Sequence, residues 1–302
     1  MEPVSPAPPI ALANAPRQNN LRGVMWMLVC GISMSAMHSS IRHVSADLHP
    51  FEIAFFRLVF GLIPILPWFI KLGWAPLRTK RLGLMTFRGV LNLVCMLAFF
   101  MALAITPLAQ VTALGFSAPI FATVLAIFIF GEKVGFQRWS AIAIGFLGAL
   151  VVIRPGFEAV SLGSALALFA AIIWGVCLVI IKSLGRTESS LTITAYMSLI
   201  MAPLSLVPAL FVWQMPTGEQ FIWLIAIGVF GGTGQMAMAE ALRIGETHVV
   251  MPIDFSRLIW VSAIAYFAFA EVPGLYTWIG GAMIFAATAF IAWRERALRN
   301  AT

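Results

Sequence analysis

Charged side chains are scarce in this chain. Of its 302 residues, 10% are Asp, Glu, Lys or Arg, whereas 61% are hydrophobic; a soluble domain carries about 25% charged residues. Water would not dissolve a surface of this composition, so the lipid bilayer is the expected solvent. The formal net charge of +7 does not indicate a nucleic-acid partner, because the basic residues fall in short breaks between apolar runs and no nucleic-acid-binding motif is present.

Cysteine is rare, and catalytic motifs are missing. Cys30, Cys95 and Cys177 lie inside apolar runs without CxxC spacing, which is typical of small apolar fillers rather than of disulfides. The sequence contains no G-x-x-x-x-G-K-[ST] loop for ATP, no G-x-S-x-G and no H-E-x-x-H, and its histidines have no metal-ligand spacing. We therefore expect no catalytic residue, no metal and no cofactor.

Long apolar segments fill most of the chain instead. Each is close to the ~20 residues that a helix needs to cross the hydrocarbon core, and strands are not expected because lipid-exposed backbone must satisfy its own hydrogen bonds. The segments are 23–42, 51–70, 82–105, 108–131, 136–153, 160–181, 191–213, 219–242, 247–270 and 275–293. This pattern predicts an all-α integral membrane protein with ten transmembrane helices.

Basic residues divide unevenly between the two predicted sides of the membrane. With the N-terminus inside, 14 of the 19 Lys and Arg residues fall on the cytoplasmic side, two fall outside and three lie within spans. The positive-inside rule therefore places both termini in the cytoplasm. Residues 1–21 are predicted to be a disordered tail, since they are rich in Pro and Ala, and residues 296–302 a cytoplasmic C-terminal tail.

An internal repeat recurs at an offset of 139 residues. Aligning 107–148 with 246–287 gives 12 identities in 42 positions. The identical pairs include Phe116/Phe255, Ser117/Ser256, Glu132/Glu271, Gly135/Gly274 and Trp139/Trp278. The offset spans five predicted helices, and because five is odd, the second copy enters the membrane in the opposite direction. The sequence thus predicts a 5+5 inverted-topology repeat, with repeat one over 22–155 and repeat two over 156–295.

The motifs of the first repeat resemble those of EamA-type members of the drug/metabolite transporter superfamily. The matching residues are Pro50, Arg57, Asn92, Phe99, Ala102, Leu103, Thr106, Pro107, Ala109, Ser117 to Phe121, Phe130 to Lys133, Gly145 and Gly148. The resemblance covers residues 22–293. The second repeat departs from the pattern, since Ala270 replaces the expected Gly before Glu271 and Leu258 stands where the first repeat has Pro119.

This resemblance implies a bacterial inner-membrane transporter with a central cavity for small organic metabolites. Its partners would be a small-molecule substrate and the lipid bilayer, with no nucleic acid, and it would be a monomer or a weak homodimer. The leading hypothesis is a secondary transporter that exports amino acids, including aromatic ones, by alternating access. The alternatives are an importer or facilitator of a nucleoside, vitamin or drug, an intramembrane enzyme, and a channel or receptor.

Charges within the predicted spans point to a site, because each costs about 2.5–3.5 kcal/mol at the centre of a helix on insertion scales. Asp254 and Arg257 lie three residues apart, hence on one helical face. They either form an ion pair that locks the helix or line the cavity and meet the amino and carboxylate groups of a zwitterionic cargo. Pro252, just before them, is expected to kink the helix and free a backbone carbonyl.

A cavity for an organic cargo needs a few polar or amphipathic groups among apolar walls. The remaining candidate substrate-binding residues are His38, Asn92, Gln110, Trp174, Tyr196 and Gln235. The alternative for His38 is a neutral packing histidine. Trp174 is a candidate cavity wall because it lies away from the interfacial belts where Trp gathers.

Further residues are expected to be structural. Arg57 is predicted to tether its helix to backbone carbonyls or an acidic partner, and Arg88 to extend toward the cytoplasmic interface. Glu132 and Glu271 end on opposite membrane faces, too far apart to cooperate in catalysis, so we expect them to cap loop ends and hold their hairpins. Pro119 belongs to the family motif of the fourth span.

Overall fold

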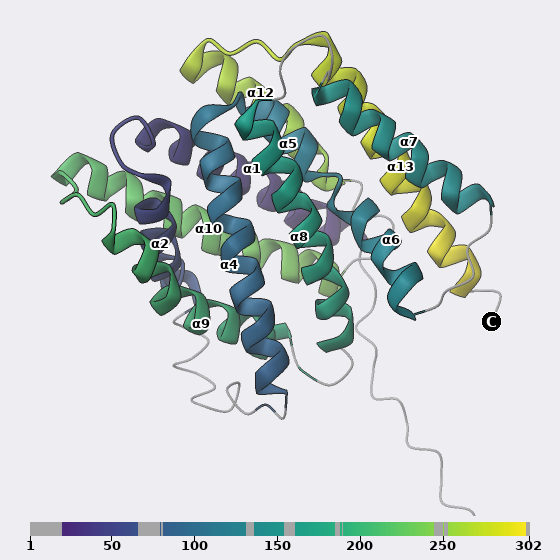
Figure 1. The fold of residues 1–302 in the computed structure, drawn as a ribbon, viewed down its shortest axis with the longest axis horizontal. Helices are drawn as coiled ribbons and strands as arrows, with labels where there is room; N and C mark the ends of the chain where they lie inside the picture. Colours follow the sequence, from purple (N-terminus) through teal and green to yellow (C-terminus); the bar gives the residue numbers. More distant parts are fainter. Residues whose placement is uncertain are drawn as a thin grey trace, which may run out of the picture.

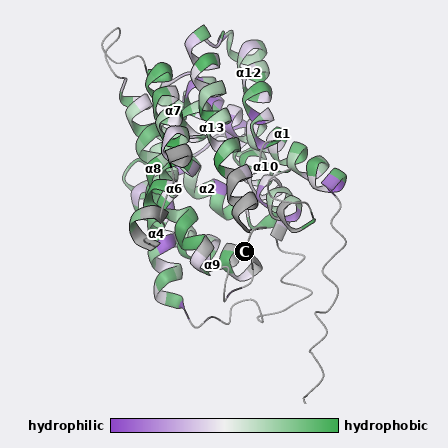
Figure 2. Ribbon diagram, turned by 90° about the vertical axis from the view of Figure 1, so that its right-hand side faces the viewer, coloured by the Kyte–Doolittle hydropathy of each residue, from purple (hydrophilic) through white to green (hydrophobic). Residues whose placement is uncertain are grey.

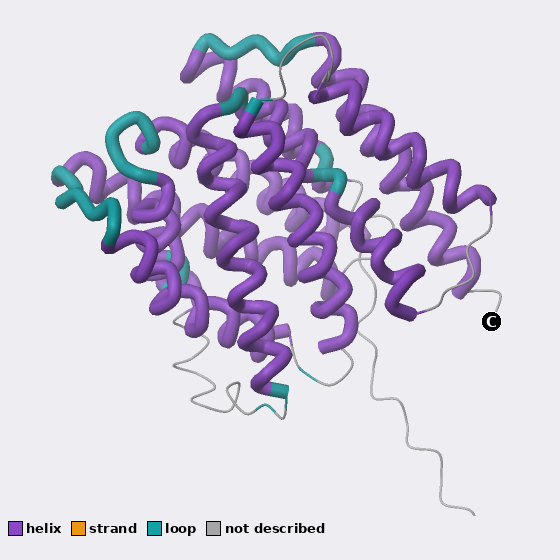
Figure 3. The backbone as a smooth tube through the Cα atoms, in the orientation of Figure 1, coloured by secondary structure: helices purple, strands orange, loops and turns teal. Residues whose placement is uncertain are grey.

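The computed structural model describes residues 20–65, 79, 81–130, 136–153, 161–184, 188, 190–244, 250 and 253–299. Throughout these residues the regular structure is helical, as the purple tube in Figure 3 shows, and no strand occurs among them. This confirms the all-α prediction for the described part of the chain. The predictions for Glu132, for Pro252 and for residues 1–19 of the tail lie outside the described residues.

Every predicted apolar segment overlaps at least one helix. The helices are α1 (Asn20–Val44), α2 (Pro50–Phe60), η1 (Ile63–Ile65), α4 (Leu82–Ile105), α5 (Leu108–Gly115), α6 (Ala118–Phe130), α7 (Phe136–Ile153), α8 (Leu162–Leu184), α9 (Ser190–Leu210), α10 (Gly218–Ile244), α12 (Ser256–Phe269) and α13 (Leu275–Arg299). Among the described residues, five helical segments are long and apolar enough to cross a membrane, with shorter apolar helices beside them. Helix α13 continues into the predicted C-terminal tail.

The surface of this bundle is apolar, whereas its interior holds polar groups. Phe211 and Phe267 have exposed fractions of 86% and 85%, while the side chains of Ser35 and Asp254 are buried. Figure 2 shows many green, hydrophobic residues along the helices, with paler and purple ones among them. Large exposed apolar areas of this kind mark contact with lipid, in agreement with the composition.

One predicted segment, 108–131, divides into two helices. Helix α5 ends at Gly115, and Phe116 and Ser117 form a turn before α6 begins at Ala118. The Ser117 hydroxyl donates to the carbonyl of Leu114 at 2.6 Å. Pro119 follows and has no N–H to continue the α5 hydrogen-bond ladder. The sequence analysis predicted one unbroken span here.

Adding the repeat offset carries the helices of the first half onto those of the second. It takes α1 onto α8, α2 onto α9, α4 onto α10, α5 and α6 onto the α12 region, and α7 onto α13. The packing follows the same correspondence: α1 lies along α10 as α8 lies along α4, and α1 meets α12 as α8 meets α6. Helices α7 and α13, which correspond to one another, run side by side at one edge of the bundle (Figure 1).

Glycines let α7 and α13 approach until their backbones touch. A Cβ atom added to Gly148 would lie 2.8 Å from the carbonyl oxygen of Gly280, and one added to Gly280 would collide with the carbonyl oxygen of Gly148. Small residues at crossing points are the usual means of close helix packing in membranes. This contact fixes the pair as one unit.

Glu271 ties the two halves together. Its Oε1 lies 3.2 Å from Arg42 Nη2, and its Oε2 accepts the N–H of Leu108, in the first turn of α5, at 3.1 Å. Arg42 also donates to the carbonyls of Leu103 and Ala104 at the end of α4. The carboxylate therefore caps a helix start, and its contacts reach α1 and α5 rather than the two helices of its own hairpin.

Candidate functional site

Two repeat-related helix breaks meet in the middle of the fold. Phe116 lies in the turn between α5 and α6, and Phe255 lies in the turn before α12. Their rings stack with centroids 4.2 Å apart and an interplanar angle of 26°, and Phe285 from α13 meets Phe255 edge-on at 4.6 Å. The stack brings together one residue from each half at identical repeat positions.

The ion pair predicted on one helical face is present beside this stack. Arg257 Nη2 lies 3.2 Å from Asp254 Oδ2, and the Arg257 guanidinium carbon lies 4.8 Å from the centre of the Phe116 ring. Helix α1 closes the other side, where the Ser35 hydroxyl lies 3.3 Å from the carbonyl oxygen of Arg257. A cation above an aromatic face is favourable, so the ring and the carboxylate together hold the guanidinium.

His38 and Arg57 complete the group from α1 and α2. The His38 ring is buried, 5.2 Å from the ring of Phe99, and the charges of Arg257 and Arg57 both act on it. Arg57 Nη1 lies 3.7 Å from the sulfur of Met96. We call His38, Arg57, Phe116, Asp254, Phe255 and Arg257 the central cluster.

Buried polar atoms without a hydrogen-bond partner gather in and beside the central cluster. They are His38 Nδ1, Arg57 Nε, Asp254 Oδ1, Ser256 Oγ and Arg257 Nε. Native proteins leave few buried polar atoms unpaired, and those that remain often mark a functional site. The central cluster can therefore offer both donors and an acceptor to a small molecule beside its aromatic rings.

Four other predicted residues lie elsewhere in the packing. Gln110 Nε2 donates to Ser164 Oγ at 3.0 Å and so joins α5 to α8. Trp174 packs in a small apolar group between α4 and α8, with Cys95 as a member, and Tyr196 packs against the apolar group of α4, α8 and α9. Gln235 is half-buried on α10. These packing groups and the Gln110–Ser164 hydrogen bond include no residue of the central cluster.

Asn92 and Arg88 face α9 from one side of α4. Asn92 Nδ2 lies 3.0 Å from the sulfur of Met197 and 3.2 Å from that of Met201. Arg88 is buried, and its Nη1 donates to the carbonyl of Ile193 at 3.4 Å, so the side chain turns inward against α9. Thioether sulfur is a weak acceptor, which leaves these donors poorly satisfied.

Sequence reasoning named the charges of the site and missed its aromatic surface. Phe116 and Phe255 were noticed only as repeat identities, because Phe is abundant in every apolar run. The available signal was their shared position: contact between equivalent residues of two repeats requires them to lie where the halves meet. Phe99, beside His38, belongs to the family motif, but the motif alone did not connect it with His38.

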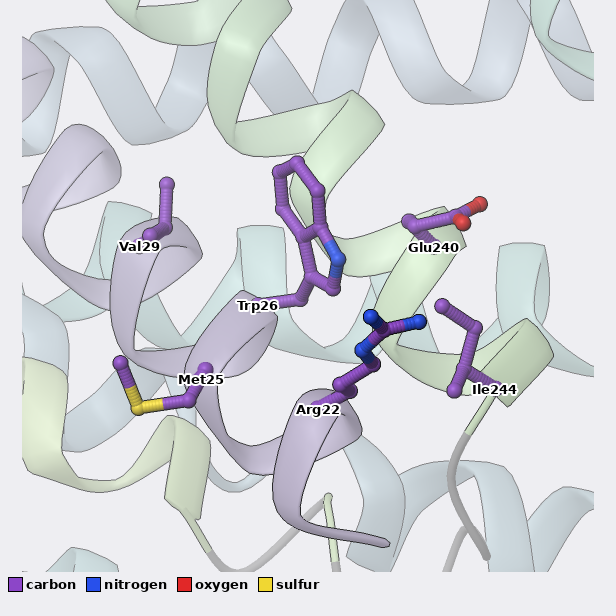
Figure 4. A pocket seen from close by; sticks show the side chains of 6 residues that line it. All are labelled: Arg22, Met25, Trp26, Val29, Glu240 and Ile244. Atoms are coloured by element: carbon purple, nitrogen blue, oxygen red, sulfur yellow. The ribbon is translucent and has the colours of Figure 1, made fainter. Parts of the chain in front are cut away.

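A separate cleft opens between the start of α1 and the end of α10. It has a volume of about 490 Å³ and is lined by Arg22, Met25, Trp26, Val29, Glu240 and Ile244. Figure 4 shows Arg22 and Trp26 from α1 facing the same space as Glu240 and Ile244 from α10. No residue of the central cluster lines this cleft.

The sequence matches the family model described as "EamA-like transporter family" twice, over residues 21–154 and 161–293. The chain belongs to the EamA-like transporter family. This confirms the resemblance drawn from the motifs. Membership makes the protein a membrane transporter rather than an enzyme, and its bacterial relatives place it in the inner membrane as a multi-pass protein.

Three curated relatives cover nearly the whole EamA-like chain. A "Riboflavin transporter" of Vibrio cholerae is 31% identical over 94% of this chain and 97% of its own length. An "S-adenosylmethionine uptake transporter" of Rickettsia felis is 30% identical over 91% of this chain and 94% of its own length. A "Pseudopaline exporter" of Pseudomonas aeruginosa is 25% identical over 87% of this chain and 93% of its own length. Small-molecule transport is thus shared among these relatives, while cargo and direction differ.

A solved structure has the same fold. It superposes with a TM-score of 0.61 at 17% sequence identity. The superposition covers 92% of this chain and 98% of the chain in the solved structure. At that identity the likeness concerns the fold alone.

Proposed function

We propose that this EamA-like protein is a secondary transporter that moves a small organic metabolite with a planar aromatic ring past the central cluster. The observation that carries the proposal is the stack of Phe116 on Phe255 at two repeat-related helix breaks, beside the pair of Arg257 and Asp254. Aromatic faces bind flat rings, and nearby charges orient the polar groups of a ligand. Substrate sites of transporters commonly lie between broken helices.

The proposed mechanism rests on a 5+5 inverted-topology repeat of ten spans, with halves 22–155 and 156–295 and both termini in the cytoplasm. The matched packing of α1 with α10 and of α8 with α4 supports it. So does the contact of Phe116 with Phe255, since equivalent residues meet on the axis that relates the halves. Rocking of the halves about this axis would expose the central cluster to each side in turn.

Riboflavin and S-adenosylmethionine, for which two relatives are named, both carry a nitrogen-containing ring system joined to a polyol or sugar. We infer that the cargo of this protein belongs to the same broad class. The proposed direction is uptake, because the relative named for uptake is 30% identical and the relative named for export is 25% identical.

Export of an aromatic amino acid is a second candidate. The observation in its favour is that Asp254 and Arg257 present both signs of charge beside an aromatic stack. Their mutual contact at 3.2 Å would have to open to admit the zwitterion, which makes this candidate the weaker one.

The decisive experiment is counterflow in liposomes that contain the purified protein. Labelled riboflavin, S-adenosylmethionine and tryptophan would be offered separately, without ATP, to vesicles preloaded with the same unlabelled compound. We expect accumulation of at least one labelled compound above that in protein-free liposomes. Absence of counterflow across a broad panel of ring-bearing metabolites would overturn the proposal.

Single substitutions test the role of the charge pair. Asp254→Asn and Arg257→Gln should each lower flux at least about tenfold, roughly the 1.4 kcal/mol of a lost charged contact, while the purified variants remain folded. Glu219→Gln, on the exposed first turn of α10, is the matched control and should retain flux. If the double swap of Asp254→Arg with Arg257→Asp restores transport, the pair serves the helix and not the cargo.

A further inference from the structure

Arg57 has no negatively charged partner among the residues that the structure describes. Its Nη1 lies 3.7 Å from the sulfur of Met96, and its Nε has no hydrogen-bond partner. The ion pairs in the described part of the chain join other residues, Arg42 with Glu271 and Arg257 with Asp254. The backbone carbonyl or acidic partner expected for a tether is not among the contacts of this guanidinium.

Among the described residues, no carboxylate contacts the Arg57 guanidinium. Helix α4 contributes Met96, and helix α10 contributes the backbone at Gly231, where an added Cβ would lie 3.1 Å from Arg57 Nε and 2.8 Å from the sulfur of Met37 on α1. His38, next to Met37, feels the charges of both Arg57 and Arg257. The neighbours are thus thioethers, glycine and imidazole, none of which carries a negative charge.

The central cluster consequently holds an excess of positive charge. Arg57 and Arg257 bring two guanidinium groups, and Asp254 brings one carboxylate that already contacts Arg257. The Arg57 side chain is partly buried, so part of its surface stays accessible. An arginine stays protonated in proteins, and at membrane depth an unpaired charge is costly unless something compensates it.

We propose that the cargo supplies the compensating charge. Arg57 binds a carboxylate or phosphate group of the transported molecule, and the aromatic ring of that molecule lies at the stack of Phe116 and Phe255. This inference rests on the proposed function and narrows it to anionic cargo. Guanidinium groups recognise both oxyanions through paired N–H donors. A ring-bearing compound without a carboxylate or phosphate group should bind less tightly than one that carries such a group.

Matched pairs of probes test the charge preference. Riboflavin and riboflavin 5′-phosphate differ by a phosphate, and indole-3-acetamide and indole-3-acetate differ by a carboxylate charge at nearly equal size. In competition with the transported compound, we expect the anionic member of at least one pair to inhibit at a concentration tenfold or more below its neutral partner. The pair whose two members inhibit at different concentrations shows whether the bound oxyanion is a phosphate or a carboxylate. Equal inhibition within both pairs, or preference for the neutral members, would overturn the inference even where transport itself is demonstrated.

Variants of Arg57 assign the preference to this residue. Arg57→Gln should remove the difference between the members of a pair, whereas Arg57→Lys, which keeps the charge, should retain part of it. If Arg57→Gln discriminates as well as the unaltered protein, Arg57 is not the anion-binding group.

A stability measurement separates binding from a tether and needs no transport. Without ligand, Arg57→Met should raise the thermal midpoint of the purified protein, because it replaces an unpaired, partly buried charge with an apolar side chain beside Met96. Arg42→Met is the matched control: Arg42 has the Glu271 carboxylate as its partner, so its loss should lower the midpoint. A lower midpoint for Arg57→Met would show a structural arginine and contradict the inference, whatever the transport assays give.

Discussion

Ala270 adopts a backbone conformation that its side chain disfavours. It ends α12 with φ 54° and ψ 24°, and it is the one residue other than glycine with positive φ in the described part of the chain. The first repeat has Gly131 at the equivalent position. The left-handed turn lets the N–H of Glu271 reach the carbonyl of Ala265 at 3.1 Å and so sets the direction of the Glu271 tie.

Ala270→Gly should therefore stabilise the protein. Relief of the left-handed conformation gains about 1–2 kcal/mol, and the greater freedom of glycine in the unfolded chain returns part of it, which leaves about 0.5–1 kcal/mol. Thermal unfolding in detergent would measure the change. Ala268→Gly, two residues earlier within helical α12, is the control. It should lower the stability by about as much as Ala270→Gly raises it. A loss of stability in both variants would contradict the argument.

The charges of the site were predictable at the residue scale, whereas their partners were not. Asp254 and Arg257 stood out because a charge inside an apolar run needs a reason. Gln110 and Trp174 looked equally suitable, yet they pack toward α8 and α4. Which way a polar side chain turns depends on helices distant in sequence, and polarity alone does not encode that choice.

At the scale of elements, helices α7 and α13 cross closely at Gly148 and Gly280. The sequence analysis could place both helices from their apolar runs, but not their pairing, because 136–153 and 275–293 are far apart in the chain. The pairing depends on Gly148 and Gly280, which leave no room for a Cβ between the two backbones.

Gly148→Leu should push α7 and α13 apart and lower stability by about 1–3 kcal/mol, the usual cost of overpacking. Gly83→Leu is the matched control, since a Cβ at Gly83 meets nothing within 4 Å. Chemical or thermal unfolding of both variants checks the prediction. Unchanged stability of Gly148→Leu would mean that the helices separate freely.

The break after α5 was the element that hydrophobicity concealed. A continuous apolar run gives no sign of a turn, and Phe116 and Ser117 are ordinary residues within it. Pro119 offered a hint, since proline interrupts the helical ladder. The repeat concealed the break further, because Leu258 replaces proline in the second half while a turn at Phe255 still precedes α12.

For the whole molecule, the number of basic residues on each side predicts cytoplasmic termini, and chemical labelling can test that topology. Gly83→Cys lies near the predicted cytoplasmic start of α4, and Thr217→Cys lies in the predicted outer loop before α10. The native Cys30, Cys95 and Cys177 are buried and should react slowly. A membrane-impermeant maleimide should label Thr217→Cys in intact cells and Gly83→Cys only after the membrane is opened; the reverse pattern would invert the topology.

The stack of Phe116 on Phe255 has a consequence for the history of the chain. Contact between a residue and its own repeat equivalent is what an isologous dimer makes on its two-fold axis. Such a contact could form between two identical, unfused halves, one of them inverted in the membrane. Residues off the axis were free to diverge once the halves were joined, as Gly131 and Ala270 have done. In the present chain each phenylalanine packs on the other, so a change at either position alters the surface that its repeat equivalent contacts.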